Sequence, residues 1–157
     1  PTEAEWERAA AGTDGRRYPW GPDEAPFRSN GAEAWLGRPF VGFSDWLTAF
    51  WNEKPWERKG HTVGAGAFPR DRSPTGCRHM AGNVWEWCQD WYYPDAYVRF
   101  GDKDPVATKQ GQKRLKVVRG GAWVDPHLYH RVSVRRHKLA PTKRNFYLGF
   151  RCARDAQ

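Results

Sequence analysis

The chain contains little sulfur and no long apolar run. Of its 157 residues, three are cysteine and one is methionine. Three cysteines allow at most one disulfide and show no zinc-site spacing, so they do not form the framework of a disulfide-stapled secreted scaffold. We expect buried thiols in a reducing cytoplasm. Because no apolar segment approaches about eighteen residues, we expect neither a membrane span nor a membrane partner. No secretory leader is expected from the first residues.

Aromatic residues supply most of the apolar material. The sequence has ten Trp, eight Phe and six Tyr, and such side chains bury a large area while retaining a polar atom. We therefore expect one globular domain over residues 1–157, with a loop-rich aromatic core. Four tryptophans of the later half are expected in that core, with carbohydrate stacking as the alternative for an exposed one: Trp85, Trp87, Trp91 and Trp123.

Positive charge is concentrated toward the C-terminus. The formal net charge is +8, and residues 108–154 contain thirteen Lys or Arg but one acid, Asp125. A basic surface of this kind suits an anionic partner such as a nucleic acid. The alternative is that several arginines bind backbone carbonyls inside a fold with little regular structure. The scattering of these arginines among apolar residues favours the second interpretation.

Local patterns predict few regular elements. Thr2 and Glu5 have capping-box spacing at the start of a helix-forming stretch over residues 3–11, which Gly12 ends. Residues 46–51 could form a second, short helix. Three segments alternate between apolar and polar residues as half-buried strands do, namely residues 115–119, 131–135 and 147–153.

Seven short motifs occur in the order found in one known family. They are residues 1–7 (PTEAEWE), 18–21 (YPWG), 66–69 (GAFP), 81–87 (AGNVWEW), 90–92 (DWY), 118–123 (VRGGAW) and 141–152. Together they resemble the formylglycine-generating-enzyme (sulfatase-modifying-factor) family and cover nearly the whole chain. The resemblance implies an α+β, C-type-lectin-like fold with little regular secondary structure and a small antiparallel sheet.

Two departures from this family bear on function. Family members usually carry an upstream portion before the PTEAEWE segment, so we expect that this portion is missing or that something else covers the surface it leaves. The oxidases of the family bind copper through two cysteines, five residues apart, after the Arg-Gly-Gly motif. Those positions are Asp125 and His130 here. Because neither is the soft thiolate that Cu(I) requires, no copper and no sulfatase-cysteine oxidation are expected.

Two other kinds of metal site have less support in the sequence. Asp125, His127 and His130 could form a carboxylate–imidazole set, but exposed polar side chains on a loop are the simpler interpretation. The sulfoxide synthases that share this domain bind iron through a histidine-rich motif on a separate upstream helical domain. No such motif is present in this sequence, and no iron is expected.

Calcium is the cofactor that the resemblance implies. The family places one calcium ion at the Gly-Asn-Val-Trp-Glu-Trp block, which carries over as the carbonyls of Gly82 and Val84 and the carboxylate of Glu86. The position three residues before Gly82 is His79, a poor calcium ligand. The alternative is that Glu86 instead pairs with a buried arginine.

The segment between the Arg-Gly-Gly and Gly-Phe-Arg motifs has a restricted residue set. Residues 124–130, 132–134 and 145–148 contain no Lys, Glu, Gln, Met or Trp. This is the set reachable from an Asn codon by changing adenines, as in diversity-generating retroelements, whose bacterial target proteins resemble this family. Loop side chains that face solvent can vary without disturbing the fold. We expect the ligand-binding surface to consist of Asp125, His127, Tyr129, His130, Phe146 and Tyr147.

The sequence thus predicts a non-catalytic domain that binds an unknown protein or small ligand at its C-terminal segment. It could be a retroelement-diversified variable protein, or a sensor domain of the kind found beside bacterial protein kinases. The alternatives are an oxygen-dependent oxidoreductase of the same family, either a formylglycine-generating oxidase or a sulfoxide-synthase-type domain, and a nucleic-acid-binding domain.

Overall fold

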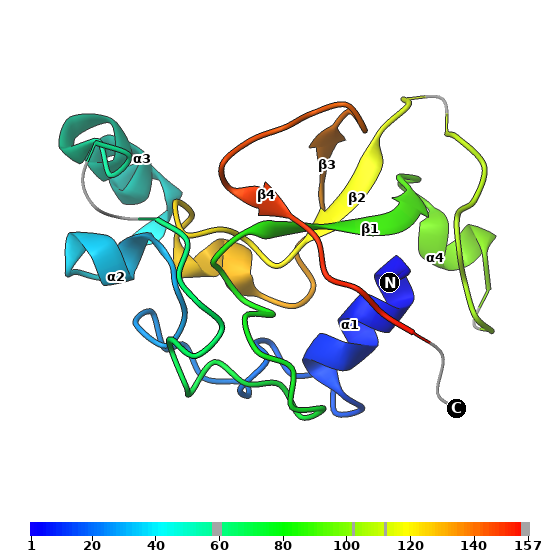
Figure 1. Cartoon of the computed structure of the whole chain (residues 1–157), viewed down its shortest axis with the longest axis horizontal. Coiled ribbons are helices and arrows are strands. Elements are labelled where there is room, and N and C mark those ends of the chain that lie inside the picture. The colour runs from blue at the N-terminus through cyan, green and yellow to red at the C-terminus, as the bar shows by residue number, and fades with distance from the viewer. Residues whose placement is uncertain (58–60, 102, 112, 155–157) are drawn as a thin grey trace.

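A small four-stranded sheet forms the centre of the molecule (Figure 1). The structure, a computed structural model, describes residues 1–57, 61–101, 103–111 and 113–154. The strands lie in the order β3-β2-β1-β4. Their bounds are Trp85–Trp91 (β1), Lys116–Arg119 (β2), Arg136–Leu139 (β3) and Leu148–Gly149 (β4). The pairs β1–β2 and β2–β3 are antiparallel, whereas β4 runs parallel to β1. The α+β class is confirmed, and the parallel β4 is the departure from the antiparallel sheet that we expected.

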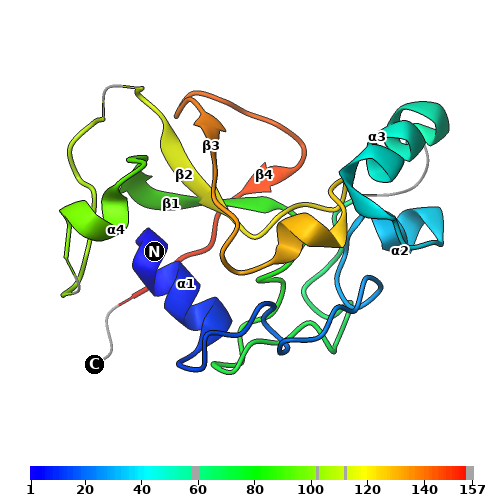
Figure 2. The same cartoon turned by 180° about the vertical axis from the view of Figure 1, so that it is seen from behind.

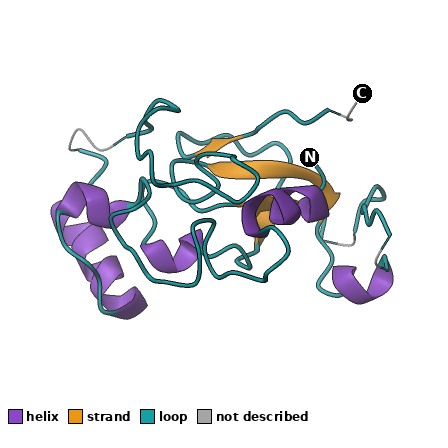
Figure 3. Cartoon of the chain, turned by 90° about the horizontal axis from the view of Figure 1, so that it is seen from below, coloured by secondary structure: helices purple, strands orange, loops and turns teal. Residues whose placement is uncertain are grey.

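Short helices surround this sheet. They are α1 (Glu3–Ala11), α2 (Ala32–Leu36), α3 (Gly42–Glu53), α4 (Ala96–Arg99) and the 3-10 helix η1 (His127–His130). Helices α2 and α3 lie together at one end of the molecule and α4 at the other, with α1 against the sheet between them (Figures 1 and 2). Loops make up most of the remaining chain (Figure 3).

Helix α1 forms where the capping box predicts it. The Thr2 side chain accepts from the Glu5 amide at 3.2 Å, and the Glu5 carboxylate accepts from the Thr2 amide at 2.8 Å. Gly12 ends the helix at φ +67°, a conformation that glycine adopts without a Cβ penalty. The inward face buries Trp6 and Ala10 in a cluster with Met80, Cys88, Val117 and Val132. This cluster joins α1 to β1 and β2.

Helix α3 is longer than the predicted residues 46–51 and positions the candidate site. Its inward side chains Trp46 and Ala49 pack against Ala32 and Phe40. The Trp46 indole also donates to the carbonyl of Val124 at 3.0 Å. This bond connects the helix to the segment that follows the Arg-Gly-Gly motif.

One strand prediction is confirmed, one is wrong and one is mostly wrong. Residues 115–119 contain β2, but residues 131–135 are not a strand. The buried Arg119 guanidinium donates to the carbonyls of Val132 and Val134, so these two acceptors bind a side chain rather than a neighbouring strand. Of residues 147–153, two form β4.

The expected core tryptophans divide into two pairs. Trp85 and Trp123 are fully buried in a cluster with Val118, Ala122, Val124 and Leu139, whereas Trp87 and Trp91 are half-buried. Of the cysteines, Cys88 is buried, Cys77 half-buried and Cys152 exposed, and all three are free. No helix in the described ranges has the length and apolar content needed to cross a membrane.

Candidate functional site

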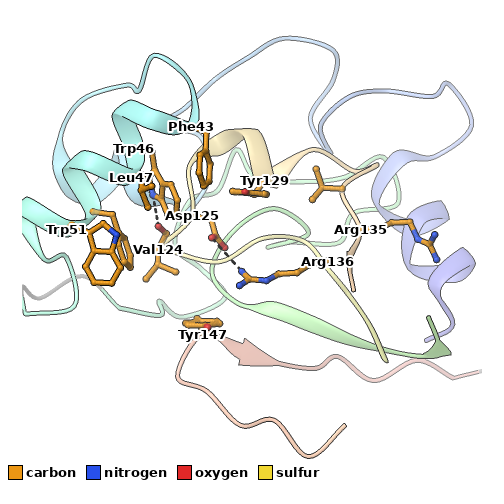
Figure 4. Close-up of a pocket in the computed structure, with 12 residues that line it drawn as sticks. Phe43, Trp46, Leu47, Trp51, Val124, Asp125, Tyr129, Arg135, Arg136 and Tyr147 are labelled. Atoms are coloured by element: carbon orange, nitrogen blue, oxygen red, sulfur yellow. Dashed lines mark hydrogen bonds and ion pairs between the residues drawn. The ribbon is translucent and has the colours of Figure 1, made fainter. Parts of the chain in front are cut away.

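A cavity of about 580 Å³ opens between α3, η1 and the strand ends (Figure 4). We call it the aromatic groove and define it by Phe43, Trp46, Leu47, Trp51, Asp125, Tyr129, Arg136 and Tyr147. Its size lies within the roughly 300–1,000 Å³ range of small-molecule sites.

One wall of the groove is an exposed apolar stripe of α3. Phe43, Leu47 and Trp51 are four residues apart, so they share one helix face. Their exposed fractions are 49%, 37% and 62%. Large apolar side chains gathered on one exposed face are typical of interaction sites.

Tyr129 of η1 and Tyr147, which precedes β4, also line the groove. The Tyr129 ring makes edge contacts with Phe43 and Trp46, both at 6.3 Å between ring centroids. Both tyrosines are half-buried and pack on the cluster around Trp85 and Trp123. These two predicted binding residues therefore lie where a ligand could contact them.

Asp125 lies at the base of the groove, buried and held by the protein itself. One carboxylate oxygen accepts from the Trp85 indole at 2.6 Å and from the Ala122 amide at 3.0 Å. The other lies 4.0 Å from a terminal nitrogen of Arg136. Burial raises the pKa of Asp125 to about 6, and the positive charge of Arg136 opposes that rise.

Arg136 is a partly exposed, positively charged side chain of the groove. It is on β3, and its guanidinium lies 5.5 Å from the Trp85 ring centroid. Figure 4 shows it pointing across the groove toward Asp125, whereas Arg135 points away toward α1. The Arg135 guanidinium binds Glu3 of α1 at 2.6 and 2.8 Å, so its role is structural.

His130 is buried, whereas the sequence predicted an exposed side chain. It is fully buried, with Nδ1 2.9 Å from the Ser29 hydroxyl and Nε2 3.2 Å from the carbonyl of Ala122. Burial lowers the pKa of His130 to about 4, so the imidazole is neutral near pH 7. A neutral ring has one donor and one acceptor; we assign the Nε2 proton to the bond with Ala122 and the Nδ1 lone pair to Ser29.

Three glycines surround the His130 ring. A Cβ at Gly31, Gly82 or Gly121 would lie against atoms of the imidazole, at 3.0 Å for Gly82 and 2.5 Å for Gly121. Gly31 and Gly82 are distant from His130 in the sequence, so the burial of this side chain depends on tertiary packing and not on a local pattern alone.

His127 is also buried, whereas the sequence predicted an exposed side chain. Its Nδ1 is 2.8 Å from a carboxylate oxygen of Glu33, and its backbone amide donates to that same oxygen. The hydrogen bond to Glu33 raises the pKa of His127 above its usual value. Since Glu33 is fully buried in α2, this pair connects η1 to α2.

Phe146 lies outside the aromatic groove. It is 63% exposed and lines a second cavity of about 410 Å³ with Trp56, His61 and Trp123. The predicted surface thus places Asp125, Tyr129 and Tyr147 in the groove and Phe146 beside it. The α3 stripe and Arg136 were not predicted, although the four-residue spacing of Phe43, Leu47 and Trp51 is a signal visible in the sequence.

The residues considered as metal ligands do not fit that role. Asp125, His127 and His130 have different protein partners, and no cluster of three His, Cys, Asp or Glu side chains suited to a metal is found in the described ranges.

The calcium ligands implied by the resemblance do not fit either. Glu86 should bind the ion together with the carbonyls of Gly82 and Val84. Its two carboxylate oxygens instead bind Arg151 at 2.6 and 2.7 Å, and one also accepts from the Trp6 indole at 2.7 Å. Glu86 thus pairs with an arginine, as in the alternative prediction, although Arg151 is half-buried rather than buried.

Three of the C-terminal arginines bind groups inside the fold. Arg119 is fully buried against backbone carbonyls and Glu7, Arg135 binds Glu3, and Arg151 binds Glu86 and the carbonyls of Arg78 and His79. These contacts account for three positive charges that a nucleic-acid surface would otherwise present.

A buried pair, Asp71 and His79, lies away from the groove. Neither Asp71 oxygen has a hydrogen-bond partner among the described residues, and the nearest imidazole nitrogen of His79 is 3.8 Å away. Burial raises the pKa of Asp71 to about 8 and lowers that of His79. The positive charges of Arg151 and Arg28 act on Asp71 and oppose the rise in its pKa.

Comparison with known proteins identifies the family of this chain. Residues 1–156 match the model of the sulfatase-modifying factor enzyme 1-like domain. The chain is 37% identical over 161 residues to the formylglycine-generating enzyme of Streptomyces coelicolor, covering 99% of this chain and 46% of that protein. It is 33% identical over 160 residues to the serine/threonine-protein kinase pkn1 of Chlamydia pneumoniae, covering 99% of this chain and 20% of the kinase.

Solved structures share the fold. Treponema denticola variable protein 1 matches with a TM-score of 0.64 and 26% identity over 96% of this chain and 45% of that protein. PvdO from Pseudomonas aeruginosa matches with a TM-score of 0.60 and 24% identity over 95% of this chain and 49% of PvdO, a likeness of fold alone. The chain spans about half the length of the formylglycine-generating enzyme that it matches. It belongs to the sulfatase-modifying factor enzyme 1-like domain family.

Proposed function

We propose that this chain is a non-catalytic recognition domain that binds a ligand or partner in the aromatic groove. One observation carries the proposal. Where the oxidases of the family are expected to place two copper thiolates, this chain has a buried carboxylate held by Trp85 and a buried imidazole held by Ser29. Neither side chain can turn toward a substrate without breaking its own hydrogen bonds.

No cysteine elsewhere replaces the missing pair. Cys88 packs with Trp6 and Met80, in a different cluster from the one beneath the groove. Burial raises the pKa of Cys88 to about 12, so its thiol stays protonated and is a poor nucleophile or metal ligand. The described lining of the groove includes no cysteine.

The groove combines exposed apolar side chains with a fixed backbone, as binding surfaces do. Its apolar side chains are exposed, whereas the segment beneath them is fixed by the Trp46–Val124 and Trp85–Asp125 hydrogen bonds. Such a surface can vary while its support stays constant. The likeness to a protein named as a variable protein supports a display role. The likeness to part of a bacterial kinase supports a sensory role.

Binding of a neutral apolar fluorophore, N-phenyl-1-naphthylamine, tests whether the groove is a recognition site. Leu47→Ser removes an exposed apolar side chain from the groove wall. Val98→Ser is the matched control, because Val98 is also exposed and lies on α4 at the other end of the molecule. We expect Leu47→Ser to weaken probe binding and Val98→Ser to leave it unchanged. Equal affinity in the two variants would contradict the proposal.

A further inference from the structure

The charge that the groove presents to a ligand is positive. The Arg136 side chain is 40% exposed, whereas that of Asp125 is 5% exposed, so a ligand entering the groove meets the guanidinium first. The carboxylate behind it already accepts two hydrogen bonds from Trp85 and Ala122.

The hydrogen-bond donors of Arg136 remain available. Its contact with Asp125 measures 4.0 Å, which is beyond hydrogen-bond distance. Within the described ranges, the Arg136 guanidinium donates no hydrogen bond to another residue. A guanidinium has five N–H donors in a planar fork, which matches the two oxygens of a carboxylate or phosphate.

The surroundings of Arg136 hold the guanidinium in place and supply apolar surface beside it. Its position 5.5 Å from the Trp85 centroid is that of a cation–π contact. Tyr129, Tyr147 and the α3 stripe supply apolar surface on the groove walls. A charge-assisted hydrogen bond is stronger where apolar groups lower the local dielectric.

We propose that the aromatic groove selects a carboxylate carried on an aromatic or branched apolar group. The carboxylate binds the Arg136 guanidinium, and the apolar body lies against Leu47 and Trp51. The inference rests on the proposed recognition function and names its ligand class. Two sources share this chemistry, a free carboxylic acid and the C-terminal residue of a peptide.

Three ligands with the same body and different charge test this selection by titration calorimetry: 3-phenylpropionate, 3-phenylpropionamide and 3-phenylpropylamine. We expect the acid to bind roughly ten-fold or more tightly than the amide, because a charge-assisted pair is replaced by a neutral contact. The amine should bind weakest. An acetylated dipeptide ending in Phe, with a free or an amidated C-terminus, separates the peptide source from the free acid.

Variants assign the preference to one residue. Arg136→Gln should reduce the affinity for the acid to that for the amide, whereas Arg144→Gln, at an exposed arginine outside the groove, should leave it unchanged. Near-UV circular dichroism checks that Arg136→Gln is folded. Amide or amine binding as tight as acid binding in the unmodified protein overturns the inference, as does absence of acid binding at millimolar concentration. Either result leaves the recognition function standing if the fluorophore still distinguishes Leu47→Ser from Val98→Ser.

Discussion

Gly31→Ala tests whether His130 fills the interior. The backbone of Gly31 is extended, at φ −132°, so alanine is not strained by its own conformation. The added Cβ would instead overlap Cε1 of His130 and lie 3.3 Å from both the Asp125 carbonyl oxygen and a Glu33 carboxylate oxygen. Overpacking of this kind costs about 1–3 kcal/mol. Because Gly82 and Gly121 bound the ring on other sides, we expect a loss near 3 kcal/mol.

Urea unfolding at pH 7 gives the free energies for a double-mutant cycle with His130→Ala. His130→Ala alone is destabilising, since it leaves a cavity and removes the partner of the buried Ser29 hydroxyl. In that background the overlap with Cε1 is removed and the two contacts at 3.3 Å remain, so the cost of Gly31→Ala should fall by about 1 kcal/mol or more. An equal cost of Gly31→Ala in both backgrounds, or no cost in either, would refute the buried position of His130.

Three further predictions follow from buried charges. Glu86→Gln should destabilise the fold by about 3 kcal/mol because it leaves Arg151 without its carboxylate. Calcium should not raise the Tm of the unmodified protein, and a calcium-dependent rise in Tm would contradict the pairing of Glu86 with Arg151. Binding of 3-phenylpropionate should become tighter from pH 7 to 5.5, because Asp125, with a pKa of about 6, loses its negative charge beside Arg136. Weaker binding at pH 5.5, measured by calorimetry, would contradict this prediction. Asp71 has a folded-state pKa of about 8, above its unfolded value of 3.8, so its proton stabilises the fold at low pH and this contribution is lost as pH rises toward 8. The difference in unfolding free energy between Asp71→Asn and the unmodified protein should therefore increase by up to about 1.4 kcal/mol per pH unit between pH 5 and 8. A difference that does not change with pH would contradict this prediction.

Two charged side chains act on the pKa of Asp125 and therefore on the pH dependence of ligand binding. Arg136 on β3 faces its free oxygen and favours the ionised form. Glu33 on α2 is the other charged group that acts on it, and it favours the protonated form. Glu33 is itself bound to His127, whose pKa that hydrogen bond raises. We therefore assign the change in ligand affinity below pH 6 to the protonation of Asp125, which takes place beside the Glu33–His127 pair.

Sequence motifs predicted those elements whose hydrogen bonds join residues close together in the chain. The Thr2–Glu5 capping box and Gly12 defined α1 because their hydrogen bonds span a few residues. The strand predicted at residues 131–135 failed because Arg119, more than ten residues away, takes the carbonyls that a strand would use. A β-type alternation does not report which acceptor a distant arginine reaches.

The candidate site was predicted in part for the same reason. The polar, loop-like segment of residues 124–130 suggested exposed side chains, and Tyr129 does line the groove. His130 is instead enclosed by Gly31, Gly82 and Gly121, and His127 is bound by Glu33. These neighbours come from other parts of the chain, so no pattern within the segment could reveal them.

Aerobic incubation with a cysteine-containing peptide and added copper, with the aldehyde product measured by mass spectrometry, distinguishes a recognition domain from an oxidase. The side chains of Asp125 and His130 are used in internal hydrogen bonds, and soft thiolate pairs are what Cu(I) requires. We predict no aldehyde above that formed by copper and peptide alone. Catalytic product formation that is lost in the His130→Ala variant, while that variant remains folded, would contradict a recognition role.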